Sequence, residues 1–106
     1  MIRFLFLFSL FIFTSCTWNE LPEVVCVPDE QVYLEWVQPI IENNCISCHS
    51  TTANMPAILG SYDGVTDALR NYSLKEEVIN RTMPPYGSPP LSESEINIIQ
   101  KWADCE

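Results

Sequence analysis

The pentapeptide Cys45-Ile46-Ser47-Cys48-His49 constrains this chain more than any other stretch. Two thiols three positions apart, followed directly by an imidazole, form the spacing used to attach a c-type haem. Each thiol can add across one vinyl group of the haem to form a thioether, and the histidine can then ligate the iron. His49 is the only histidine of the chain. The pattern therefore predicts one covalent haem c held by Cys45 and Cys48, with His49 as an axial ligand.

Two other kinds of site also use paired cysteines. A structural zinc ion usually takes four ligands, so Cys26 or Cys105 would have to join the pentapeptide. A thioredoxin-like redox pair lies beside a βαβ pattern, and the sequence has no such pattern. Attachment of haem is therefore favoured over both alternatives.

Residues on either side of the pentapeptide add a family resemblance. The patterns PII..NC..CH, MPP and LS..E...I..W occur here as Pro39 to Ile41, Asn44 with Cys45 to His49, Met83 to Pro85, and Leu91 and Ser92 with Glu95, Ile99 and Trp102. In these patterns the chain resembles the small single-haem class I cytochrome c domains of bacteria, from about Leu34 to Trp102. The resemblance implies an all-α cytochrome c fold, with about three to five helices around one covalent haem and the first and last helices crossing.

A second axial ligand can come from Met55 or Met83, each of which precedes a proline. Met55 follows His49 by only six residues, whereas Met83 follows it by 34, in a loop stiffened by prolines. The longer connection allows the chain to reach the opposite face of the haem. Met83 also matches the MPP motif of the family, so the resemblance implies that it is the sixth ligand. The alternatives are an open or water-ligated iron, with Met83 as a gap-filling core residue.

Other residues are weaker candidates for contact with the haem. Arg70 or Arg81 could meet a propionate, although a solvated surface position is the more ordinary role of an arginine. Apolar residues that could form the wall of the haem pocket, and that could equally be ordinary core residues, are Leu59, Tyr62, Ile79 and Trp102.

The first 15 residues resemble a secretory signal. One cation, Arg3, precedes two apolar runs that are shorter than the ~20 residues needed to span a bilayer. The segment from Phe13 to Cys16 looks like a bacterial lipobox, with Phe13 where leucine is usual. We expect cleavage before Cys16 and lipidation of that cysteine; ordinary cleavage nearby would leave it as a stray thiol. An aspartate directly after the lipidated cysteine would resemble a signal for retention in the inner membrane, but residue 17 is a threonine. We therefore expect a periplasmic lipoprotein of the Gram-negative outer membrane.

Two cysteines, Cys26 and Cys105, remain near the ends of the mature chain. Residues 16–31 are expected to form a lipidated tether and residues 32–106 the haem domain. An exported chain permits Cys26 and Cys105 to pair, whereas a reducing cytosol would not. A bridge that closes a loop of this size contributes about 4.5 kcal/mol by the chain-entropy relation. The alternative is two free thiols.

The charge of the chain is strongly acidic. It has 14 acidic and 5 basic residues, for a formal net charge of −9. Such a surface cannot neutralise the phosphates of a nucleic acid. It favours redox partner proteins with a basic docking surface. Electrostatic attraction would speed their association, and this effect weakens as the salt concentration rises. An acidic exported protein without such steering is the plainer alternative.

Hydrophobic periodicity predicts helices near residues 34–44, 64–71, 74–81 and 93–104, and no strands. Pro39 is expected to limit the start of the first helix to about one turn before it. Capping boxes are expected at Ser73 with Glu76 and at Ser92 with Glu95. The buried faces are predicted to contain Leu34, Val37, Ile40, Ile41 and Asn44 in the first helix, and Ile96, Ile98, Ile99, Trp102 and Ala103 in the last.

These features together favour an electron carrier and not an enzyme. A thioether ligand favours ferrous iron, and two filled axial positions leave no site for oxygen or substrate. The chain also lacks a second histidine that could serve as a distal acid or base. The alternatives are a peroxidase-like haem enzyme or sensor with a displaceable sixth ligand, and a structural haem subunit of a larger oxidoreductase.

Overall fold

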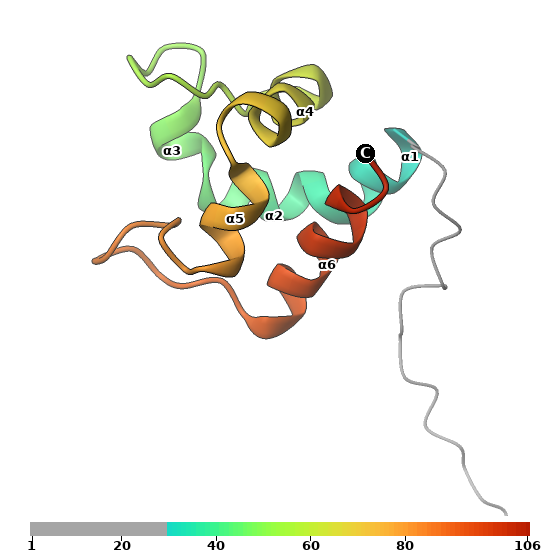
Figure 1. The fold of residues 1–106 in the computed structure, drawn as a ribbon. Coiled ribbons are helices and arrows are strands. Elements are labelled where there is room, and N and C mark those ends of the chain that lie inside the picture. Colours follow the sequence, from blue (N-terminus) through green and yellow to red (C-terminus); the bar gives the residue numbers. More distant parts are fainter. Residues whose placement is uncertain (1–29) are drawn as a thin grey trace, which may run out of the picture.

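The computed structural model describes residues 30–106. The expected signal peptide, the lipidation of Cys16 and the tether before Glu30 lie outside the described residues. The described part is helical, with no strand (Figure 1), which confirms the all-α class for these residues. Its helices are α1 (Glu30–Val32), η1 (Tyr33–Val37), α2 (Gln38–Asn44), α3 (Ile46–His49), α4 (Tyr62–Asn71), α5 (Leu74–Ile79) and α6 (Glu93–Ala103).

The first helical segment begins earlier than the sequence predicted. Helical backbone is already present at Glu30, the first described residue and nine residues before Pro39, and the part from Tyr33 to Val37, η1, is a π-helix. The ring of Pro39 would clash with the carbonyl four residues earlier in an α-helix. In η1 the N–H of Gln38 instead bonds to the carbonyl of Tyr33, five residues back. The wider turn accommodates the proline, so the chain continues as a helix through it.

The buried face of this segment also differs from the prediction, because Asn44 is only half-buried and Leu34 is exposed. Val37, Ile40 and Ile41 are buried as expected, but Leu34 is 47% exposed and Tyr33 is buried in its place. Tyr33 lies four residues before Val37, one turn back on the same helix face.

Helix α4 starts two residues before the predicted position, because Ser61 caps it. The N–H of Gly64 donates to the hydroxyl of Ser61 at 3.1 Å. The carbonyl of Ile58 comes so close to this turn that a Cβ at Gly64 would lie 2.1 Å from it. Only glycine permits this approach, which holds the end of the 50–60 loop against α4.

The two predicted capping boxes have different outcomes. At α6 the box is present: the Ser92 hydroxyl accepts from the N–H of Glu95 at 3.2 Å, and the Glu95 carboxylate accepts from the N–H of Ser92 at 2.8 Å. At α5 the prediction was wrong. Ser73 has φ 53° and ψ 36°, in the left-handed region, and its side chain makes no capping bond. An N-cap side chain reaches the first turn from extended backbone, which Ser92 has and Ser73 lacks.

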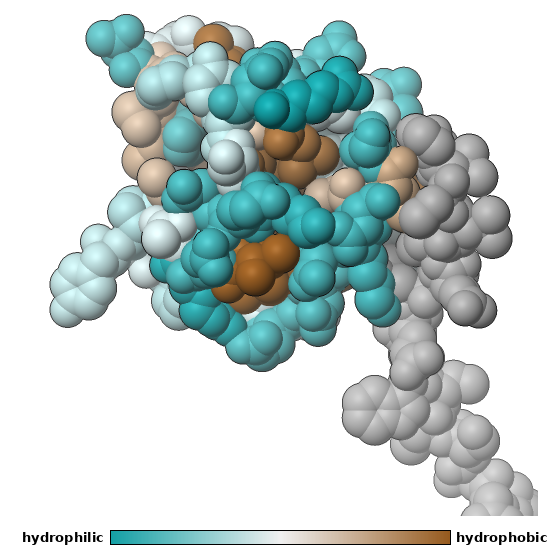
Figure 2. All heavy atoms as spheres, viewed as in Figure 1, coloured by the Kyte–Doolittle hydropathy of each residue, from teal (hydrophilic) through white to brown (hydrophobic). Residues whose placement is uncertain are grey.

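The core lies where α6 packs against η1 and α5 (Figure 1). Helix α5 also packs against α4. Tyr33, Tyr62 and Trp102 form an aromatic cluster there, with the rings of Tyr33 and Trp102 5.5 Å apart and those of Tyr33 and Tyr62 5.2 Å apart. Figure 2 shows hydrophilic residues over most of one face, with small hydrophobic areas between them. Buried side chains from the separate helices include Val37, Ile41, Val65, Val78, Ile96, Ile99 and Trp102.

The cysteines fall into two groups. Cys45 and Cys48 are free thiols, whereas Cys105 is disulfide-bonded. Its predicted partner, Cys26, lies outside the described residues. No helix within residues 30–106 is long and apolar enough to cross a membrane.

Candidate haem-binding site

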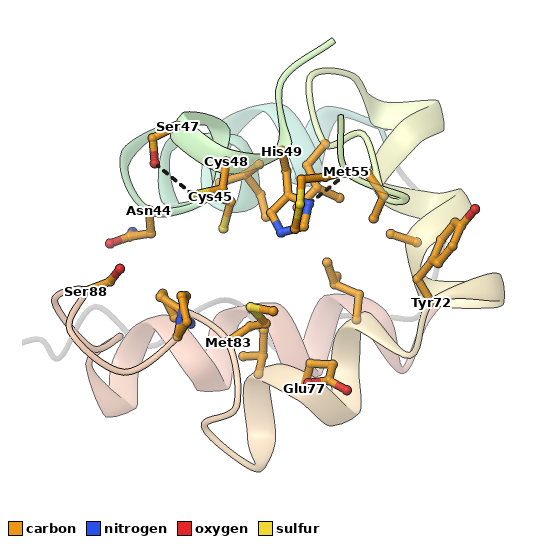
Figure 3. Close-up of a pocket in the computed structure, with 18 of the residues that line it drawn as sticks. Asn44, Cys45, Ser47, Cys48, His49, Met55, Tyr72, Glu77, Met83 and Ser88 are labelled. Atoms are coloured by element: carbon orange, nitrogen blue, oxygen red, sulfur yellow. Dashed lines mark hydrogen bonds between the residues drawn. The ribbon is translucent and has the colours of Figure 1, made fainter. Parts of the chain in front are cut away.

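A cavity of about 400 Å³ separates two parts of the described chain (Figure 3). We call residues 41–59 the His49 wall and residues 72–91 the Met83 wall; Ala68 of α4 completes the lining. From the His49 wall the lining residues are Ile41, Asn44, Cys45, Ser47, Cys48, His49, Met55, Pro56, Ala57 and Leu59. From the Met83 wall they are Tyr72, Leu74, Glu77, Val78, Met83, Pro84, Pro85, Ser88 and Leu91.

The two cysteines and the histidine share one side of a helical turn. Cys45 is the C-cap of α2, and Cys48 and His49 follow on α3. The N–H of His49 donates to the carbonyl of Cys45 at 2.9 Å, so the three residues keep helical spacing. Positions three and four residues apart are neighbours on a helix surface. The local backbone therefore brings both thiols and the imidazole to the same cavity.

The imidazole of His49 is oriented by a backbone group. Its Nδ1 lies 2.8 Å from the carbonyl oxygen of Ala57. A carbonyl can only accept, so Nδ1 carries a proton and donates it, and in the neutral ring Nε2 is then the nitrogen with the free lone pair. The N–H of Leu59 donates in turn to the carbonyl of His49 at 2.9 Å, which ties the 50–58 loop back to α3. A fixed tautomer with a free Nε2 is the form in which histidine ligates a metal.

The thiols of Cys45 and Cys48 have different surroundings. Cys45 is half-buried and Cys48 is exposed. Burial raises the pKa of the Cys45 thiol to about 11, because the charged thiolate is poorly solvated there. Cys45 is therefore a neutral thiol at physiological pH and a poor nucleophile until it is deprotonated.

The two candidate methionines lie on different sides of the cavity. Figure 3 shows Met55 beside His49, whereas Met83 approaches from the opposite side. Both are partly exposed, at 41% and 38%. A group bound between the walls would therefore meet His49 and Met83 on opposite faces. Met55 would lie on the same face as His49.

Met83 itself lies in the chain just beyond the end of α5. The N–H groups of Thr82 and Met83 both donate to the carbonyl of Glu77, at 3.0 and 3.1 Å. Arg81 has a left-handed backbone with φ 58°, which ends the helix. Its guanidinium donates to the carbonyl of Leu91 at 3.3 Å and pairs with the Glu93 carboxylate. Arg81 thus joins the two ends of the proline-rich loop that carries Met83.

Of the predicted wall residues, only Leu59 lines the cavity. Tyr62 and Trp102 follow the core alternative, since they pack with Tyr33 in the aromatic cluster. Ile79 fits neither role, because it is exposed at the end of α5. The arginines Arg70 and Arg81 do not line the cavity. Aromatic and apolar side chains serve a protein core and a cofactor wall equally well, so their type alone could not separate the two roles.

Several lining residues were not singled out from the sequence. Leu74 and Val78 are buried on one face of α5, and their spacing of four residues was a visible signal. Glu77 lies one position before Val78 and also lines the cavity. Ala57 acts through its backbone carbonyl, for which the sequence contains no side-chain signal.

The residues present fit a covalent haem. The cavity has apolar walls, two thiols on one side, and a nitrogen and a thioether sulfur on opposite sides, which are the donors used by c-type haems. Among residues 30–106 no group of three or more His, Cys, Asp or Glu side chains is arranged to hold a bare metal ion.

Comparison of the chain with protein-family models, curated proteins and solved structures found no match. The function is therefore inferred from the residues and geometry of this chain.

Proposed function

We propose that this protein carries single electrons through one covalently bound haem c. Cys45 and Cys48 would anchor the haem through thioethers, and His49 and Met83 would ligate its iron. The observation that carries the proposal is the cavity in which both thiols and the imidazole of one wall face the methionine of the other.

The chemical role of each residue follows from its donor atom. The haem would supply a reversible one-electron couple between ferric and ferrous iron. The Ala57 carbonyl holds the Nδ1 proton of His49, so Nε2 is presented without a change of tautomer. Met83 offers a soft thioether that favours ferrous iron and raises the reduction potential. With both axial positions filled, electron exchange is favoured over binding of oxygen or substrate.

The distribution of charge supports docking at the mouth of the cavity. Leaving out the residues before Glu30, the chain has 11 acidic and 4 basic residues. None of them lies in residues 43–62 or 82–92, the two segments that flank the cavity. These segments instead contain the exposed apolar side chains Met55, Ile58, Met83 and Tyr86.

This arrangement favours a partner whose contact face is uncharged and whose surroundings are basic. Rim charges mainly set the rate of association and its dependence on salt. The acidic remainder of the domain would steer a basic partner, and the uncharged segments would make the contact. Export and a lipid anchor at Cys16 would tether this carrier to the outer membrane, within reach of periplasmic partners.

The proposal is tested by producing the full chain in a host that matures c-type cytochromes. We expect the mass of the polypeptide to increase by one haem. We expect the ferric form to show the sulfur-to-iron charge-transfer band, which Met83→Ala should abolish. Met55→Ala is the matched control and should keep the band. A polypeptide without added haem would overturn the proposal.

Two other outcomes would point to different functions. An unchanged spectrum in Met83→Ala would mean that Met83 is not a ligand and would favour a haem enzyme or sensor. A carrier that diffuses freely should elute alone when the solubilised native protein is passed through a size-exclusion column. Elution with a larger oxidoreductase would favour a structural haem subunit.

A further inference from the structure

The end of α5 holds Met83 by more contacts than a helix stop requires. The N–H of Arg81 donates to the carbonyl of Val78 at 3.2 Å, and the N–H of Thr82 donates to the carbonyl of Glu77 at 3.0 Å. Together with the left-handed backbone at position 81, these hydrogen bonds form a Schellman motif. Two features are additional to it. The N–H of Met83 also donates to the Glu77 carbonyl, at 3.1 Å. The hydroxyl of Thr82 contacts both the carbonyl of Glu77 (3.0 Å) and its carboxylate.

The residue in the left-handed position is also unusual for such a motif. Glycine is the common choice there, because a Cβ makes this conformation unfavourable. Arg81 occupies it here, and its side chain reaches Leu91 and Glu93 at the far end of the loop. An arginine makes the left-handed backbone less favourable than glycine would. Unlike glycine, it also contacts the far end of the loop that carries Met83.

We propose that Thr82 and Arg81 are positioning residues that hold the Met83 thioether against iron. Thr82 fixes the start of the loop to Glu77, and Arg81 joins the start to the end at Leu91 and Glu93. We call this set of contacts the clasp. The inference rests on the proposed haem ligation and adds to it the residues that keep the sixth ligand in place.

The clasp matters most in the ferric state. A thioether is a soft donor and favours ferrous iron, so its bond to ferric iron is the more easily opened. How often Met83 leaves ferric iron then depends on how firmly the protein holds the loop. An added ligand that competes with Met83 measures this directly, because its apparent affinity is proportional to the open fraction.

The positioning role of Thr82 and Arg81 can be distinguished from a purely structural role. Thr82 and Arg81 are both exposed and do not line the cavity. Removing the Thr82 hydroxyl leaves no hole in the core, so Thr82→Val should keep the helical circular dichroism of the parent. A change in ligand exchange without a change in fold would identify a positioning role.

The test uses the full haem-loaded chain in the ferric state, titrated with imidazole. We expect Thr82→Val to raise the apparent imidazole affinity by roughly 3- to 10-fold, the effect of losing one hydrogen bond to a charged group at a partly solvated site. Thr82→Ser keeps the hydroxyl and should restore the parent affinity. Thr51→Val, an exposed threonine of the opposite loop that does not line the cavity, is the matched control and should have no effect.

A second variant tests the arginine independently of the threonine. Arg81→Gly keeps the helix stop, since glycine readily adopts this backbone, but removes the tie to Leu91 and Glu93. We expect a rise in imidazole affinity of similar size. If it binds imidazole like the parent, Arg81 has no positioning role.

The outcomes separate the clasp from the function on which it rests. If Met83→Ala binds imidazole no better than the parent, the ligand assignment fails and the clasp fails with it. If Met83→Ala binds imidazole much more tightly while Thr82→Val and Arg81→Gly both match the parent, the ligand assignment survives and the clasp alone is overturned.

Discussion

The two walls of the cavity present their donor atoms in different ways. On the His49 wall, Cys45, Cys48 and His49 lie within one helical turn, and a single backbone carbonyl orients the imidazole. On the Met83 wall, the methionine lies in a loop between α5 and α6, and contacts between residues as far apart as Arg81 and Glu93 hold it. The two thiols and the imidazole are therefore brought together by local spacing, whereas the position of Met83 depends on the tertiary structure.

This difference predicts how substitutions in each wall should affect haem binding. Changes to the local spacing of the His49 wall should abolish attachment outright. Changes around the Met83 wall should leave the haem attached and alter its sixth ligand or the stability of the loop.

The largest effect is expected from the double variant Cys45→Ser with Cys48→Ser. Without either thiol no thioether can form, so we expect complete loss of covalent haem after maturation. Haem staining after denaturing electrophoresis, together with intact mass, measures this. Ser47→Ala lies between the two cysteines and should retain the haem. Covalent haem in the double variant would mean that the attachment site lies elsewhere.

Gly64→Ala should strongly destabilise the support of the His49 wall. The new methyl group would overlap the carbonyl of Ile58 at 2.1 Å, and the loop that presents the Ala57 carbonyl would have to shift. We expect a loss of about 2 kcal/mol in the free energy of unfolding. Urea denaturation monitored by circular dichroism measures it.

Gly60→Ala is the control for this experiment, because a Cβ there meets nothing within 4 Å. Its effect should stay within about 0.5 kcal/mol. Equal losses in the two variants would show that the close approach of Ile58 to α4 is unimportant.

Ser92→Ala should have a moderate effect at the end of the Met83 wall. It removes the side-chain half of the capping box that starts α6, directly after Leu91. Loss of such a cap costs about 1 kcal/mol. Ser73→Ala is matched to it, since Ser73 makes no capping bond, and should change the unfolding midpoint little. A larger effect at Ser73 would contradict the assignment of the caps.

The last effect is confined to alkaline pH and concerns the aromatic cluster, outside both walls. Burial, with a smaller contribution from the nearby Glu42 charge, raises the pKa of Tyr33 above its usual value near 10. The unfolded chain then ionises this tyrosine more readily than the folded one. Stability is therefore lost as the pH rises from about 10 towards the raised pKa, by at most about 1.4 kcal/mol per pH unit.

Tyr33→Phe removes this ionisation and should flatten the fall in unfolding free energy above pH 10. Thermal unfolding at a series of alkaline pH values measures the slope. Tyr86→Phe changes a fully exposed tyrosine and should keep the slope of the parent. If Tyr33→Phe also keeps it, the burial of Tyr33 does not govern alkaline stability.

Local patterns predicted the helices well where the backbone was ordinary. Ser92 and Glu95 form the expected capping box, and Ile96, Ile99 and Trp102 are buried along α6. The same motif failed at Ser73, because the backbone there is left-handed and the side chain makes no capping bond. The first helix was expected to begin later, because that prediction assumed α-helical hydrogen bonding before Pro39, where the structure has a π-helical turn.

The amino-acid sequence alone accounts for the donor groups that the site offers and for the helical spacing that gathers Cys45, Cys48 and His49. Those choices depend on neighbours within five positions. Tertiary packing sets which methionine faces His49, which carbonyl orients its imidazole, and which apolar residues line the cavity instead of the core. These outcomes depend on contacts between segments far apart in the chain, and residue type does not encode which segments meet.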